Sequence, residues 1–71
     1  MRLTSLMVEM TEGWASLALH SLPDDSTPNP PHIAISVPCP ATGDAAEIRA
    51  RAIAAALRAL DEARAVLEAA R

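Results

Sequence analysis

Residues 44–71 read DAAEIRARAIAAALRALDEARAVLEAAR, and twelve of these 28 residues are alanine. Apolar side chains recur every three or four positions along the whole stretch, which is the spacing of an amphipathic α-helix. Asp44 is a good N-cap residue, and Glu47 follows three positions later, as in a capping box. The sequence therefore predicts one long helix over 44–70, with Thr42 as the rival cap.

The apolar side of this helix is wide, covering about half of the circumference on a helical wheel. Its large side chains form a ridge that we expect to pack on a sheet: Ile53, Leu57, Leu60 and Leu67. Ile48 and Val66 lie apart from the ridge, and alanines fill the arc between. Because alanine permits close backbone approach, the arc suits either the same sheet or the interface of a partner or homo-oligomer. Both alternatives stay open from the sequence.

Ahead of the helix, alternating polar and apolar residues predict β-strands. Residues 3–12 and 14–22 alternate in this way, with Leu6, Val8 and Met10 on one face. Gly13 permits the positive φ of a tight turn, so we predict a β-hairpin over 3–22 with a two-residue turn. Residues 32–38 form a third predicted strand, which ends at prolines that cannot donate to a β-ladder.

The segment between the second and third strands, residues 23–31, reads PDDSTPNPP and holds four of the six prolines. Their fixed φ angles predict a stiffened loop, long enough for a meander or a crossover, and we favour the meander. The predicted fold is α+β, a single small domain over 1–71. It has a three-stranded antiparallel sheet in β-β-β-α order, with one long C-terminal helix packed on one face.

The length and the composition of the chain limit which classes of function we expect. A core built from 71 residues is only marginally stabilising, and a single cysteine excludes an intrachain disulfide, so a partner subunit is the expected source of further stability. No apolar run is long enough to span a bilayer, so we expect no membrane contact. The expected location is the cytoplasm, or the host cytoplasm or virion if the protein is phage-encoded.

Charge is distributed unevenly along the chain. The net charge is −3, and the predicted helix sums to zero, so the first 43 residues carry the whole imbalance. No basic stripe is present to neutralise phosphates, which argues against a nucleic-acid partner. The acidic half instead favours a protein partner with a basic surface. Within the helix, Glu47–Arg51 and Asp61–Arg64 have the spacing of surface ion pairs.

The residue types that carry catalysis are few. His20 and His32 fall on the outward phase of their strands and would meet if these strands pair, but a metal would need a third ligand. Cys39, between two prolines, is expected to be an exposed loop thiol without a base to activate it. We therefore predict no metal, no cofactor and no enzymatic activity.

Contact with a partner is the remaining role for the exposed side chains. Trp14 lies either on the outer sheet face, as a binding hot spot, or wraps round the sheet edge beneath the helix. Arg49 and Arg64 border the apolar ridge, either covering it with their stems or anchoring an interface. The candidate partner-binding residues are Met7, Glu9, Glu12, Trp14, His20, Asp24, Asp25, Arg49 and Arg64.

Two resemblances follow from this order of elements. The run Thr42-Gly43-Asp44-Ala45-Ala46-Glu47 at the start of an alanine-rich helix, after three strands, resembles the partial double-stranded-RNA-binding fold of HicB-type antitoxins. The chain departs from that family in its proline-rich loop, its lack of a DNA-binding tail and its missing aromatic residues. Size and the single β-β-β-α unit also resemble small phage- and prophage-borne accessory proteins, which include anti-CRISPR inhibitors and minor virion components.

These observations predict a non-enzymatic protein–protein interaction module, encoded by a phage or mobile element. It would dock on a larger protein as an inhibitor, or assemble in copies as a minor virion component. The alternative is a HicB-like antitoxin that binds a small toxin. In each case the expected partner is a protein, with possible self-assembly through the alanine-rich helix.

Overall fold

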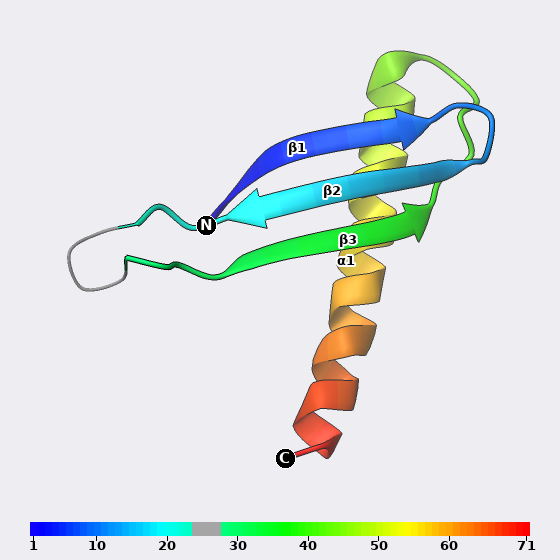
Figure 1. Ribbon diagram of the computed structural model, residues 1–71. Coiled ribbons are helices and arrows are strands. Elements are labelled where there is room, and N and C mark those ends of the chain that lie inside the picture. The colour runs from blue at the N-terminus through cyan, green and yellow to red at the C-terminus, as the bar shows by residue number, and fades with distance from the viewer. Residues whose placement is uncertain (24–27) are drawn as a thin grey trace.

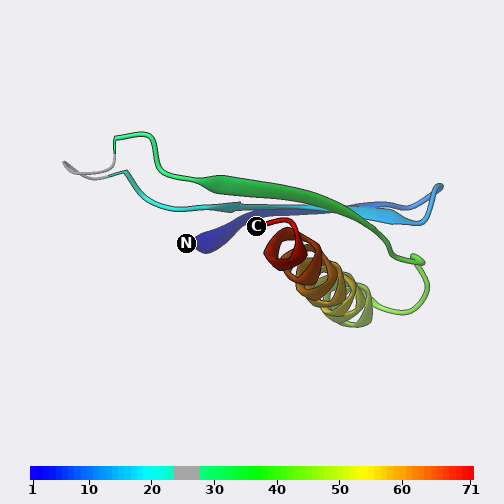
Figure 2. The same cartoon turned by 90° about the horizontal axis from the view of Figure 1, so that it is seen from below.

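The computed structural model describes residues 1–23 and 28–71. Three strands, β1 (Arg2–Glu9), β2 (Trp14–His20) and β3 (His32–Pro38), precede one helix, α1 (Ala45–Ala69). The strands form an antiparallel meander in the order β1-β2-β3 (Figure 1). α1 lies under one face of the sheet and crosses the strands steeply, so the molecule has two layers (Figure 2). This confirms the predicted α+β fold.

The hairpin between β1 and β2 has a longer turn than the alternation predicted. The last pair of the ladder is Glu9 with Trp14, which leaves the four residues 10–13 as the connection instead of two. The N–H of Gly13 donates to the carbonyl of Glu9 at 3.1 Å, and Gly13 has a φ of 71°. Closing the chain over four residues uses this left-handed conformation, which glycine adopts without strain. Met10 therefore leaves the strand and is exposed.

A β-bulge at Thr4 interrupts the β1–β2 ladder. Leu3 pairs with Leu19, but the next pair is Ser5 with Ala18, so Thr4 is the extra residue. Its hydroxyl donates to the carbonyl of Ala18 at 3.1 Å. An extra residue reverses the side-chain alternation. Leu3 consequently joins Leu6 in packing against the core, although an odd number of positions separates them.

The start of α1 follows the predicted cap. The carboxylate of Asp44 accepts a hydrogen bond from the N–H of Glu47 at 2.8 Å, so Asp44 and not Thr42 is the N-cap. The predicted Glu47–Arg51 pair is wrong, because Arg51 instead donates to the carbonyls of Pro40 and Thr42. This guanidinium therefore binds the loop after β3 to the second turn of the helix.

Alanine faces the sheet across the centre of the molecule. The buried residues are Ala15, Leu17, Val37, Cys39, Ala52 and Ala56. Of the predicted ridge, Ile53 and Leu60 are half-buried, whereas Leu57 and Leu67 are exposed by 59% and 70%. The ridge prediction is thus wrong in part. Small side chains at 52 and 56 let the helix backbone approach the sheet, and the large ones lie at the margins of this contact.

The second half of α1 extends beyond its own sheet. Every residue from Asp61 to Arg71 is exposed, and this part of the helix runs past β3 (Figure 1). We call residues 61–71 the overhang. Among the described residues, no helix has an apolar stretch of the length that crossing a membrane requires.

The alanine contact can be tested by enlarging one side chain. We expect Ala52→Leu to lower the free energy of unfolding by about 1–3 kcal/mol, because the added atoms overfill a site that is fully buried. Ala54→Leu is the matched control, since Ala54 is exposed on the same helix and should change stability by less than about 0.5 kcal/mol. Urea unfolding followed by circular dichroism measures both. Equal effects would mean that Ala52 does not face the sheet.

Candidate protein interaction surfaces

No described part of the chain covers the sheet face opposite α1, and the hairpin end of this face carries large apolar side chains (Figure 2). The register places Glu9 opposite Trp14 and Met7 opposite Ser16, with all four on this outer face. Met7 is 68% exposed, and Trp14 is 46% exposed. We call Met7, Glu9, Met10, Glu12 and Trp14 the hairpin patch. Trp14 therefore lies on the outer face and does not pack beneath the helix.

The hairpin patch combines apolar contact area with one sign of charge. Glu9 and Glu12 are exposed beside Trp14 and the two methionines, and no basic residue belongs to the patch. Arg2, the nearest arginine along β1, is seven residues from Glu9, which is about 23 Å along a strand. Tryptophan and methionine are enriched in binding surfaces, and the acidic residues favour a basic counterpart.

His20 lies at the opposite end of the same face. It pairs with His32 across β2 and β3, and the two rings stack with centroids 5.4 Å apart and planes inclined by 18°. The hydroxyl of Thr4 lies 2.6 Å from His20 Nδ1. About 20 Å of strand separates His20 from Trp14, so His20 does not belong to the hairpin patch. The described residues contain no group of three potential metal ligands.

Cys39 is buried, contrary to the exposed thiol expected from the sequence. Its N–H donates to the carbonyl of Gly13 at 2.7 Å, and its sulfur donates to the carbonyl of Ile48 at 3.7 Å. These contacts hold the residue between the hairpin turn and the first turn of α1. The flanking prolines were a poor guide, because the burial of the thiol comes from contacts with the hairpin turn and the helix.

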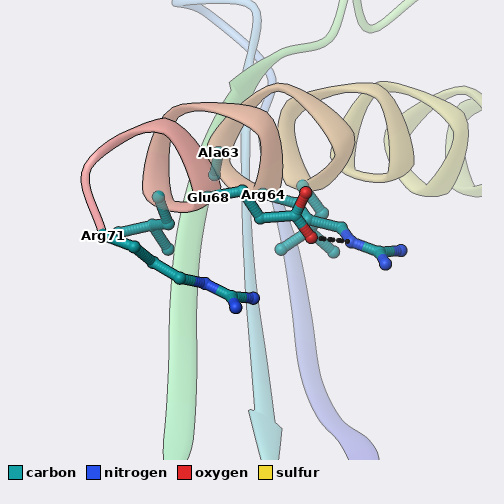
Figure 3. Close-up of a pocket in the computed structure, with 6 residues that line it drawn as sticks. Ala63, Arg64, Glu68 and Arg71 are labelled. Atoms are coloured by element: carbon teal, nitrogen blue, oxygen red, sulfur yellow. Dashed lines mark hydrogen bonds and ion pairs between the residues drawn. The ribbon is translucent and has the colours of Figure 1, made fainter.

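Arg49 and Arg64 lie on α1 and therefore on the other layer of the molecule. Both are exposed. Arg64 Nε donates to Glu68 Oε1 at 3.1 Å, which replaces the predicted Asp61–Arg64 pair (Figure 3). The candidate residues from the sequence thus divide between two faces. Asp24 and Asp25 lie outside the described residues.

The overhang is the surface that sequence reasoning did not single out. It carries Val66 and Leu67, exposed by 67% and 70%, beside a shallow hollow lined by Leu60, Ala63 and the Arg64–Glu68 pair (Figure 3). A signal was available in the sequence. A helix of about 25 residues is about 37 Å long, whereas three strands span only about 14 Å, so a steep crossing leaves helix uncovered.

Comparison with known proteins adds no relative. The chain matches no protein-family model, and neither the curated proteins nor the solved structures give a match. The interaction surfaces are therefore argued from their residues alone.

Burial of Cys39 predicts an unreactive thiol in the folded protein. We expect a thiol-specific chromogenic reagent to react at least about a hundredfold more slowly with the native chain than with the chain in denaturant, because reaction requires local opening. Ser36→Cys, on the exposed outer face of β3, is the control and should add one rapidly reacting thiol. Fast native labelling of Cys39 would contradict its placement between hairpin and helix.

Proposed function

We propose that this protein is a non-enzymatic protein–protein interaction module that docks through its hairpin patch onto a basic surface of a larger protein. The observation that carries the proposal is the exposure of Trp14 and Met7 on a sheet face that no described residue covers, with Met10 exposed in the adjoining turn. Large apolar side chains gathered at one exposed site mark binding surfaces more often than chance exposure does.

The composition of the hairpin patch resembles that of an interface centre with a polar rim. Trp14 supplies the large, rigid contact area that binding hot spots use, and the two methionines adapt to an irregular partner surface. Glu9 and Glu12 lie at its border, where charge acts mainly on association rate and on the choice of partner. A basic surface on the partner would complement these carboxylates.

A binding role is supported over catalysis by the state of the reactive side chains. Cys39 is buried with its thiol directed at the carbonyl of Ile48, and His20 contacts the hydroxyl of Thr4 and stacks on His32. The Thr4 hydroxyl also donates to the carbonyl of Ala18, so this cluster is bound into the β1–β2 ladder, whereas Trp14 and Met7 are exposed to a partner.

The kind of protein that the patch binds remains a prediction from the sequence resemblances. An anti-CRISPR-like inhibitor would bind a host effector protein, a minor virion component would bind neighbouring particle subunits, and a HicB-like antitoxin would bind a small toxin. These three possibilities share the hairpin patch as the proposed contact and differ in what it contacts.

Site-specific photo-crosslinking identifies the partner and tests the face. We expect a photoreactive residue in place of Ser16, beside Met7 on the outer face, to crosslink one protein in the organism that encodes the chain. The same residue in place of Arg58, exposed on α1, is the control and should not crosslink that protein. Mass spectrometry of the adduct gives the partner. Crosslinking to the same protein from Arg58 but not from Ser16 would contradict the proposal.

Affinity for the purified partner should depend on the methionines and glutamates of the hairpin patch and on salt. Trp14 is the only tryptophan of this chain, so its fluorescence, after subtraction of the partner's own emission, reports binding at the hairpin patch. We expect Met7→Ala and Met10→Ala together to weaken binding at least about tenfold. We also expect rising salt to weaken it, and Glu9→Gln with Glu12→Gln to reduce that salt dependence. Salt-insensitive binding would exclude the electrostatic part of the proposal.

A further inference from the structure

β3 forms one edge of the sheet, and apart from Pro38, its last residue, it lacks the features that protect edge strands. Such strands usually carry charges, bulges or prolines that prevent pairing with another chain. β1, at the opposite edge, has a bulge at Thr4 and charged residues at both ends. β3 reads HIAISVP, has no charged residue between its terminal His32 and Pro38, and pairs with β2 without a register shift. Its free N–H and C=O groups are thus open to another strand.

The overhang presents an apolar face that no described part of this chain covers. At 100° per residue, Val66 and Leu67 flank the line on the helix that Ala52 and Ala56 define, and these alanines face the sheet. The overhang therefore continues the sheet-facing side of α1 into a region where this chain has no more strands. Its surface is suited to cover a sheet.

The inner face of the sheet has an apolar groove beside α1. Its volume is about 180 Å³, and its lining residues are Leu3, Leu17, Leu19, Ile53, Ala56, Leu57 and Leu60. Leu57 on its rim is 59% exposed. Only aliphatic side chains line the groove, so its natural occupant is an apolar side chain.

We propose that two copies of this chain pair antiparallel through their β3 edges, and that the overhang of each crosses beneath the sheet of the other. A two-fold axis perpendicular to the sheet joins the two three-stranded sheets into one and keeps both helices on the same face. The helices then run antiparallel, side by side. Leu67 of each copy approaches the groove beside Leu57 of the other.

Dimensions support a second copy as the occupant. The ten residues 61–70 extend about 15 Å as a helix. Three strands at about 4.8 Å spacing are about 14 Å wide. The overhang is thus as long as the partner's sheet is wide. The arrangement also pairs the β3 edge, covers the overhang and fills the groove with one partner. An unrelated partner would have to supply both a strand and a helix.

This dimer is independent of the proposed function. The hairpin patch lies on the outer sheet face, opposite the helices, so it stays exposed in the dimer. Failure of the dimer would leave docking through Trp14 untouched, and loss of docking would leave the dimer untouched.

Light scattering of the purified chain across a concentration series tests the dimer without any partner. We expect a mass of twice 7.5 kDa at high concentration. Leu67→Glu should raise the dimer dissociation constant at least about a hundredfold, because two buried leucines are lost per dimer. Ala65→Glu is its control, since residue 65 lies on the opposite side of the helix, and it should leave the constant within about threefold.

A second pair of variants distinguishes pairing through the β3 edge from pairing through the β1 edge. Ser5 and Ala34 lie in the same cross-strand row, one on β1 and one on β3, and both are exposed. Ala34→Lys should weaken the dimer at least about tenfold through like charges across the axis, while Ser5→Lys should not. Circular dichroism checks that each variant keeps the fold.

Three results would overturn the proposed dimer, and one further measurement would support it directly. A chain that stays monomeric at all concentrations overturns the proposal. So does a dimer that Leu67→Glu leaves intact, or one that Ser5→Lys weakens more than Ala34→Lys. Slower amide exchange in β3 than in β1 at high concentration, lost on dilution, would support pairing at the β3 edge directly.

Discussion

The close contact between the alanine side of α1 and the inner face of the sheet is the constraint on which the rest of the structure depends. Ala52 and Ala56 are buried with Ala15, Leu17 and Val37, and no aromatic side chain contributes to this core. Small residues gain less from burial than large ones, so the contact has to be close and continuous to stabilise so short a chain. The bound loop after β3, held by Arg51, fixes where the helix meets the sheet.

This contact also decides which apolar residues stay uncovered. Because alanines occupy the centre, Leu57 and Leu67 lie at the margin or beyond the sheet, and the steep crossing carries the last turns of α1 past β3. The sheet's other face keeps Met7 and Trp14 exposed. The molecule therefore has two separate exposed apolar surfaces, one on each layer.

Much of the fold was predictable because its signals are local. Alternation located the strands, and Asp44 with Glu47 located the start of the helix to within about two residues, with Thr42 as the rival cap. The predictions failed where a non-local contact or an irregularity of the backbone determines which way a side chain faces. The Thr4 bulge reverses the alternation at Leu3, and the four-residue turn removes Met10 from β1. Contacts of Cys39 with Gly13 and Ile48 accompany the burial of a thiol that its neighbouring prolines suggested was exposed.

The order of elements and the acidic character of the hairpin follow from the sequence alone, since each depends on residues close together in the chain. The sequence favoured the meander over a crossover, and it left the cap between Asp44 and Thr42. It also placed Trp14 on the face away from Leu17, as one of two alternatives. Only the tertiary structure decided which side of the helix faces the sheet and how much of the helix the sheet covers. Both properties depend on the angle at which the helix crosses the sheet and on the width of three strands. The periodicity of the helix sequence determines neither quantity.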